Sequence, residues 1–250
     1  MDDNIFALGW DVGGWMGSSN SFVFIEANKK NNKINWFYSE KNYQLKKDEL
    51  FELKEIINEL SEKPFHTFST LIIGIDAPLT FPRQFVNFLN QEEVYIKKPS
   101  KEIFNPLAYR AADRYIYDKY GKKPLSATFD RLGNNTTVAV SHLRYWQQKH
   151  QINLNFTTLS QDRINVIETY PALSKPSKFA KAYKNINNVI PDDIKVGTDQ
   201  YDAALCALMA VQFGFENDFG KLPSLVFPPE EEKTYSKESW IYHFNLENIK

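Results

Sequence analysis

Two aspartates three residues apart open the most apolar helical segment of the chain. Asp199 and Asp202 start a run that stays apolar to residue 213, and their spacing places both carboxylates on one helix face. Two further acids, Asp11 and Asp76, each end a hydrophobic, strand-like run. We therefore expect three distant segments to bring their carboxylates together in one acidic pocket.

Clustered carboxylates without a matching set of histidines or cysteines favour hard cations such as Mg²⁺ or Mn²⁺, which prefer oxygen ligands. The four histidines are scattered along the chain, and the only cysteine, Cys206, lies inside the apolar helical pattern. Two such ions about 4 Å apart activate water and stabilise the leaving oxygen in phosphodiester hydrolysis. Each acid alone also has an ordinary explanation as a helix cap or a turn residue, and their combination favours the metal site.

Hydrophobic periodicity indicates the elements that must position these acids. Short apolar or branched runs predict strands at residues 5–10, 22–25, 34–38, 70–75 and 163–167. Helical spacing predicts helices at residues 47–62, 108–120, 137–149 and 199–213. The first three strands are expected to be antiparallel. Glu168 directly follows the fifth strand and is expected near the acids, as a metal ligand or a water-orienting base.

The chain has 250 residues, of which 42% are hydrophobic, enough for a single α/β domain with a sizeable core. We expect one domain over residues 1–250, with a largely helical insertion at about 92–162 and an irregular tail at about 215–250. A formal charge of -1 gives no global basic signature, and a single cysteine excludes an internal disulfide. The start of the chain resembles neither a signal peptide nor a transmembrane segment, so a cytoplasmic location without membrane contact is expected.

Five short motifs occur in a recognisable order: GWDVGG (9–14), GIDAPL (74–79), YRAADR (109–114), ETYP (168–171) and DQYDA (199–203). Together they resemble domain-of-unknown-function family 429, predicted ribonuclease H-like nucleases, over about residues 5–213. The resemblance implies a ribonuclease H-like fold, in which a five-stranded mixed sheet with three antiparallel first strands is flanked by helices. The Asp-x-x-Asp pair is also similar to that of RuvC-type resolvases, which implies that Asp11, Asp76, Asp199 and Asp202 are the metal ligands.

The insertion carries a local excess of positive charge. Residues 97–131 contain nine Lys or Arg and four Asp or Glu, and they include Arg110, Arg114 and Arg131. A basic surface beside an acidic metal site suits the phosphates of a DNA or RNA substrate, so we expect these three arginines to bind substrate. The alternative is a solvated helix face on which Arg110 pairs with Asp113.

A metal-dependent nuclease is the leading hypothesis, and two alternatives stay open. Residues 11–17 resemble the first phosphate loop of actin-like sugar kinases and ATPases, which predicts an ATP-binding phosphotransferase. Against this, residues 76–82 contain prolines where the second phosphate loop needs amide donors. The other alternative is a noncatalytic ribonuclease H-like binding module, which would have no affinity for a divalent ion.

Overall fold

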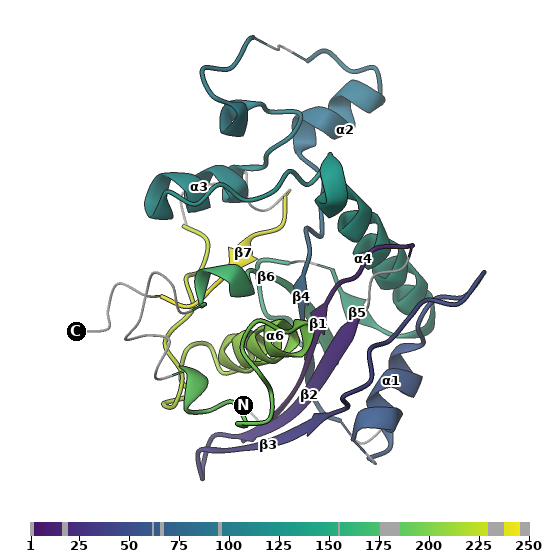
Figure 1. Cartoon of the computed structure of the whole chain (residues 1–250), viewed down its shortest axis with the longest axis vertical. Helices are drawn as coiled ribbons and strands as arrows, with labels where there is room; N and C mark the ends of the chain where they lie inside the picture. Colours follow the sequence, from purple (N-terminus) through teal and green to yellow (C-terminus); the bar gives the residue numbers. More distant parts are fainter. Residues whose placement is uncertain are drawn as a thin grey trace.

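The computed structural model describes residues 3–16, 20–61, 63–65, 68–94, 97–154, 156–175, 186–229 and 238–245, and only the backbone of residues 130–132. A seven-stranded mixed sheet forms its centre (Figure 1). The strands are β1 (Asn4–Asp11), β2 (Ser21–Asn28), β3 (Lys33–Tyr38), β4 (Leu71–Asp76), β5 (Ile152–Asn153), β6 (Ile164–Thr169) and β7 (Ile241–Tyr242).

The strand order is β3-β2-β1-β4-β6-β5, and β7 pairs with β6. β2 is antiparallel to both β1 and β3, which confirms the predicted antiparallel start. β4 and β6 continue the sheet in parallel to β1. All five predicted strands are present. The predicted number of strands was too low because β5 and β7 have two residues each, too few to show a periodic pattern.

The described residues include five α-helices: α1 (Leu53–Leu60), α2 (Arg83–Leu89), α3 (Ala111–Tyr120), α4 (Asp130–Lys149) and α6 (Asp199–Gly214). Two short 3₁₀ helices, η2 (Glu102–Phe104) and η3 (Pro171–Leu173), lie in the connections. α1 starts later than predicted, because Asp48 adopts a left-handed φ of 63° that a right-handed helix does not allow. α4 starts seven residues earlier than predicted, since its first turns are polar and carry no apolar period.

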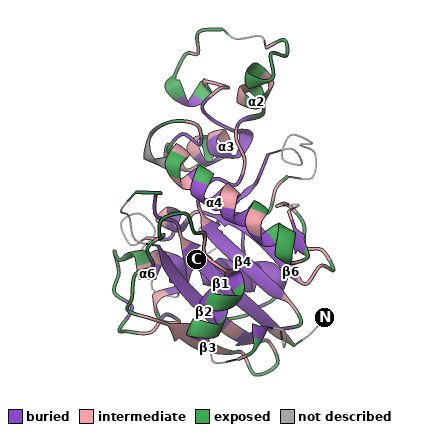
Figure 2. Cartoon of the chain, turned by 90° about the vertical axis from the view of Figure 1, so that its right-hand side faces the viewer, coloured by how far each residue is buried: buried purple, intermediate pink, exposed green. Residues whose placement is uncertain are grey.

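The sheet is buried on both faces, with alternate residues of each strand entering different cores (Figure 2). On one face, Ile5, Ala7 and Ile72 pack with α6. On the other face, Leu8, Trp10 and Ile73 pack with residues of α1 and α4. This alternation fixes which side chains at the strand ends point toward α6.

Two glycines allow α6 to lie against the sheet at very short range. A Cβ on Gly9 would lie 1.9 Å from the carbonyl oxygen of Ala203, and one on Gly74 would lie 2.4 Å from that of Cys206. Gly9 and Gly74 are register partners on adjacent strands. The helix therefore approaches two neighbouring strands where neither has a side chain, which brings its first turn close to the ends of both strands.

The insertion as far as α3 lies above the sheet, together with α2, at the top of the view in Figure 1, whereas α4 packs against the sheet. Glu238, from the C-terminal segment, accepts hydrogen bonds from the backbone amides of Arg83 and Ala111 at 2.8 Å, so it joins the N-termini of α2 and α3. Together with β7, this contact shows that the predicted irregular tail takes part in the fold. Within the described ranges, none of the helices has the length and apolar character needed to cross a membrane.

Candidate metal centre

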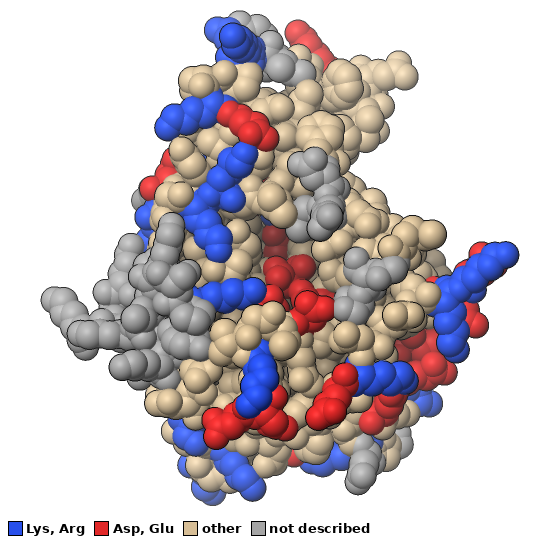
Figure 3. Space-filling model, viewed as in Figure 1, with Lys and Arg blue, Asp and Glu red and all other residues tan. Residues whose placement is uncertain are grey.

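Three of the predicted acids meet at one end of the sheet. Asp11 ends β1, Asp76 ends β4, and the two residues are register partners in the parallel ladder. Each lies two residues after a glycine that faces α6, so both side chains point to the helix side. Asp202, in the first turn of α6, completes a group in which one carboxylate oxygen per residue lies within 4.8 Å of the others. Figure 3 shows acidic side chains at the bottom of a hollow near the centre of this face.

Asp199 is close to this group without belonging to it. It is the first residue of α6, after the cap Thr198, whose side chain accepts a hydrogen bond from the amide of Tyr201. Its side chain is exposed, and its charge contributes to the raised pKa of Asp11 and of Asp202. The structure thus brings together Asp11, Asp76 and Asp202, and it leaves Asp199 exposed outside this group, where its side chain lines a separate surface pocket.

The three buried carboxylates repel one another strongly. Burial, followed by the charges of Asp76 and Asp202, raises the pKa of Asp11 to about 9. Burial and the charge of Asp202 raise the pKa of Asp76 to about 7, and burial also raises the pKa of Asp202. A site in which neighbouring acids resist ionisation in this way is one that a bound cation would stabilise.

Lys175 supplies part of the missing positive charge. Its Nζ donates a hydrogen bond to Oδ2 of Asp202 at 2.7 Å, and it lowers the pKa of Asp11, Asp76 and Asp202 against the effect of burial. The other oxygen of Asp202, Oδ1, is buried and has no hydrogen-bond partner among the described residues. Burial of a carboxylate oxygen without a partner is costly, and a cation bound there would reduce that cost.

The donor set fits Mg²⁺ or Mn²⁺. All three groups offer carboxylate oxygens, the ligands that these ions prefer. Mg²⁺ holds its ligands at about 2.1 Å, so opposite ligands lie at most about 4.2 Å apart, and oxygens that lie within 4.8 Å of one another need only a small adjustment to bind one ion. Asp11, Asp76 and Asp202 are therefore the residues that would hold such an ion.

Glu168 does not join the three aspartates. It pairs in register with Ile75, whose side chain packs on the α4 face of the sheet, so strand alternation turns Glu168 away from α6. Both of its oxygens accept hydrogen bonds from Arg110 at 2.6 Å, and Oε2 also accepts one from the amide of Leu79 at 2.9 Å. Because Leu79 lies in the turn after Asp76, Glu168 is placed to hold that turn in position.

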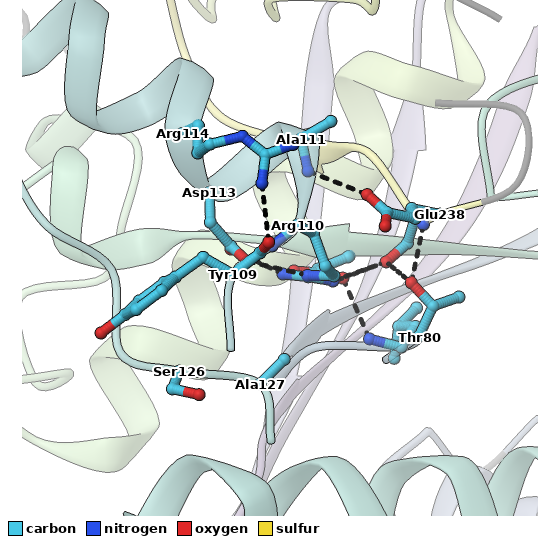
Figure 4. A network of polar contacts seen from close by, with 12 residues as sticks. Thr80, Tyr109, Arg110, Ala111, Asp113, Arg114, Ser126, Ala127 and Glu238 are labelled. Atoms are coloured by element: carbon cyan, nitrogen blue, oxygen red, sulfur yellow. Dashed lines mark hydrogen bonds and ion pairs between the residues drawn. The ribbon is translucent and has the colours of Figure 1, made fainter. Parts of the chain in front are cut away.

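Arg110, one of the three arginines predicted to bind substrate, is deeply buried. It is only 1% exposed, and Figure 4 shows its side chain within a polar network. Its guanidinium also pairs with Asp113, at 2.9 and 3.1 Å. Burial lowers the pKa of Arg110, but the charges of Asp113 and Glu168 outweigh burial and keep it above its ordinary value. Arg110 is therefore held by ion pairs within the protein, but it also lines a cavity together with Asp11 and Asp76, so its contact with a substrate stays a prediction.

The other two arginines are placed differently. Arg114 is half-buried and donates a hydrogen bond to the carbonyl oxygen of Tyr109 at 2.8 Å (Figure 4). Arg131 lies in the first turn of α4, and its side chain is outside the described residues. The sequence prediction did not include Lys175, because a lone lysine in a loop has no pattern that distinguishes it.

The glycine-rich loop after β1 is bonded within the protein. The amide of Gly13 donates to the side-chain oxygen of Asn20 at 2.9 Å, and the amide of Trp15 donates to that of Asn134 at 3.4 Å. In the loop after β4, the amide of Leu79 is engaged by Glu168. These amides are therefore not directed at a nucleotide phosphate, which weighs against the actin-like interpretation.

A cavity of about 240 Å³ adjoins the metal centre. Its lining includes Asp11 and Asp76, the ion-paired residues Arg110, Asp113 and Glu168, and apolar residues such as Pro124, Leu125 and Ala172. Acidic and apolar walls together suit a ligand that has both a charged and an apolar part.

Comparisons of the chain with protein-family models, with curated proteins and with solved structures found no match.

Proposed function

We propose that this protein is a metal-dependent nuclease that hydrolyses phosphodiester bonds of nucleic acid. One observation carries the proposal: carboxylates from residues 11, 76 and 202 converge to within 4.8 Å. Three acids that far apart in sequence, all partly buried and close enough to raise one another's pKa, are difficult to explain by capping or turn formation. A bound Mg²⁺ or Mn²⁺ would offset this repulsion.

The arrangement of the sheet supports the ribonuclease H-like assignment. Three antiparallel strands followed by two parallel ones agree with the five-stranded mixed sheet that the resemblance implies. The acids also lie where that resemblance places them, on the first strand, the fourth strand and the last long helix. Asp199 stays a predicted ligand, one helical turn from Asp202.

The proposed reaction is hydrolysis at phosphorus. The oxygen of a water molecule bonds to phosphorus, the bond to the leaving sugar oxygen breaks, and one proton of that water ends on the leaving oxygen. Bound divalent ions supply charge stabilisation and an activated water in such reactions. In this chain, the three aspartates would hold the ions, and Lys175 would place positive charge beside the phosphate. Glu168 and Arg110 would keep the turn after Asp76 in position.

A cleavage assay with matched variants tests this function. Asp11→Asn and Asp202→Asn should fold normally and lose Mn²⁺-dependent hydrolysis of a panel of DNA and RNA substrates by at least about 100-fold, since loss of a ligand exceeds the usual effect of an outer-shell change. Asp118→Asn, an exposed acid on α3, is the control and should retain activity. Equal rates for all four proteins would refute the assignment.

A nucleotide titration tests the phosphotransferase alternative. An ATP-binding protein is stabilised by its ligand in proportion to ligand concentration. The backbone amides of Gly13, Trp15 and Leu79 already donate hydrogen bonds to side chains of the protein. We therefore expect the same melting temperature with ATP and Mg²⁺ together as with Mg²⁺ alone. A further rise with ATP would favour the actin-like function over the nuclease.

A further inference from the structure

The two sides of the hollow above the three aspartates differ in chemistry. One side carries Lys122 and Lys175, whose charges both act on Asp76 and Asp202. Lys122 donates a hydrogen bond at 2.7 Å to the carbonyl oxygen of Ala172, a residue that lines the adjoining cavity. Figure 3 shows basic side chains along the left side of the hollow. This side suits the phosphates of a nucleic-acid backbone.

The opposite side is apolar and aromatic. It is formed by the loop after β1 and the start of α4, which are joined by a hydrogen bond from Asn135 to the carbonyl oxygen of Val12 at 2.8 Å. Asn135 lines the same cavity as Asp11 and Asp76, so this side borders the metal centre. Exposed apolar side chains here are Trp15 and Met16 in the loop after β1, 38% and 91% exposed, and Leu125 and Phe129 in the segment before α4, 57% and 49% exposed.

Trp15 is held rigidly although more than a third of it is exposed. Its indole Nε1 donates to Oγ1 of Thr137 at 2.9 Å, and its ring stacks against that of His142 with centroids 6.4 Å apart. An aromatic ring fixed in this way loses little conformational freedom when it binds a planar partner. Trp15 is therefore suited to stack on a nucleic-acid base.

We propose, on the basis of the proposed nuclease function, that the substrate is single-stranded nucleic acid, with its phosphates toward Lys122 and Lys175 and a base stacked on Trp15. A positively charged groove combined with an aromatic stacking surface is the usual means of binding an unpaired strand. Paired bases within a duplex are stacked on one another and present no free face to Trp15. The adjoining cavity of about 240 Å³ is small and also fits a single unpaired unit better than a duplex.

Binding and cleavage measured separately test this inference. Fluorescence anisotropy in a chelator, where no metal-dependent cleavage occurs, should show that a labelled single strand binds at least about ten-fold more tightly than the same sequence in a blunt duplex. Trp15→Ala should weaken single-strand binding about ten-fold, which is within the range known for one stacked base. Trp15→Phe should restore most of the affinity. Phe88→Ala, an exposed aromatic on α2, is the control and should leave the affinity unchanged.

The kinetic arm distinguishes this inference from the function on which it rests. With Mn²⁺, Trp15→Ala should raise KM for the single strand about ten-fold at unchanged kcat and unchanged Mn²⁺ affinity. Equal binding of duplex and single strand, or an unaffected Trp15→Ala protein, would overturn the inference. Absence of hydrolysis on every substrate would instead refute the nuclease function, and the anisotropy result would still decide how nucleic acid binds.

Discussion

Replacing Asp11 by Asn should stabilise the protein at alkaline pH when no metal is present. The pKa of Asp11 is raised from an ordinary value of 3.8 to about 9 by burial and by the neighbouring acids. A carboxyl whose pKa is higher in the folded state holds its proton more tightly there than in the unfolded chain. Because the folded site resists ionisation, the free energy of unfolding falls as pH rises from about 4 to about 9.

The size of this effect has an upper limit that follows from the pKa. Each pH unit between the two pKa values corresponds to about 1.4 kcal/mol, so at pH 8 the penalty is at most about 6 kcal/mol. Such a value would equal the whole stability of many domains, and the partial exposure of Asp11 together with the charge of Lys175 reduces it. We expect Asp11→Asn to increase the free energy of unfolding by about 1–3 kcal/mol at pH 8. For a chain of this length, that increase corresponds to a rise of roughly 3–10 °C in melting temperature.

Thermal unfolding in EDTA at a series of pH values between 5 and 9 measures this gain. The difference between Asp11→Asn and the unsubstituted protein should be smallest at pH 5 and increase steadily toward pH 9. Asp118→Asn is the control and should show no such trend. A loss of stability for Asp11→Asn, equal at pH 5 and pH 8, would show that the Asp11 carboxylate stabilises the fold and would refute the reasoning.

Addition of Mn²⁺ extends the same experiment to the metal site. At 100 times its dissociation constant, a ligand that binds only the folded state adds about 2.7 kcal/mol. Mn²⁺ should therefore raise the melting temperature of the unsubstituted protein and have much less effect on Asp11→Asn. A noncatalytic binding module with clustered acids would be stabilised by the substitution but would not respond to Mn²⁺, so the second arm separates the two hypotheses.

Two further substitutions test how the centre is held in place. Gly74→Ala would place a Cβ 2.4 Å from the carbonyl oxygen of Cys206, so α6 must shift. We expect the free energy of unfolding, measured in urea, to fall by about 1–3 kcal/mol, and calorimetry to show weaker Mn²⁺ binding. Gly220→Ala meets no atom within 4 Å and is the control. Arg110→Met would leave buried carboxylates unpaired, including Glu168, and should lower the free energy of unfolding by about 3–5 kcal/mol. A decrease below about 1 kcal/mol would show that the ion pairs are dispensable.

Local sequence patterns were sufficient for the five longer strands, the last helix and three of the acids, but they did not predict α2, β5 or β7. The five longer strands and the last helix appear as apolar runs, because residues buried on both faces of a sheet form continuous hydrophobic segments. Asp11 and Asp76 each end such a run, and Asp202 lies in the first turn of a helix. One available signal was overlooked: a glycine precedes each strand-end aspartate by two residues, which marks the place where α6 approaches the sheet.

Which acids meet was decided only by the packing of the chain. Every residue of β6 is buried, so the sequence has no alternation to show which face Glu168 occupies, and the register with β4 turns it toward Arg110. Likewise, Asp199 and Asp202 look equivalent in sequence, and the contact of α6 with the two strand glycines brings only Asp202 into the group. Residue type and spacing determine where a carboxylate lies along its own element, whereas distances between elements depend on register and close packing, which short-range patterns do not contain.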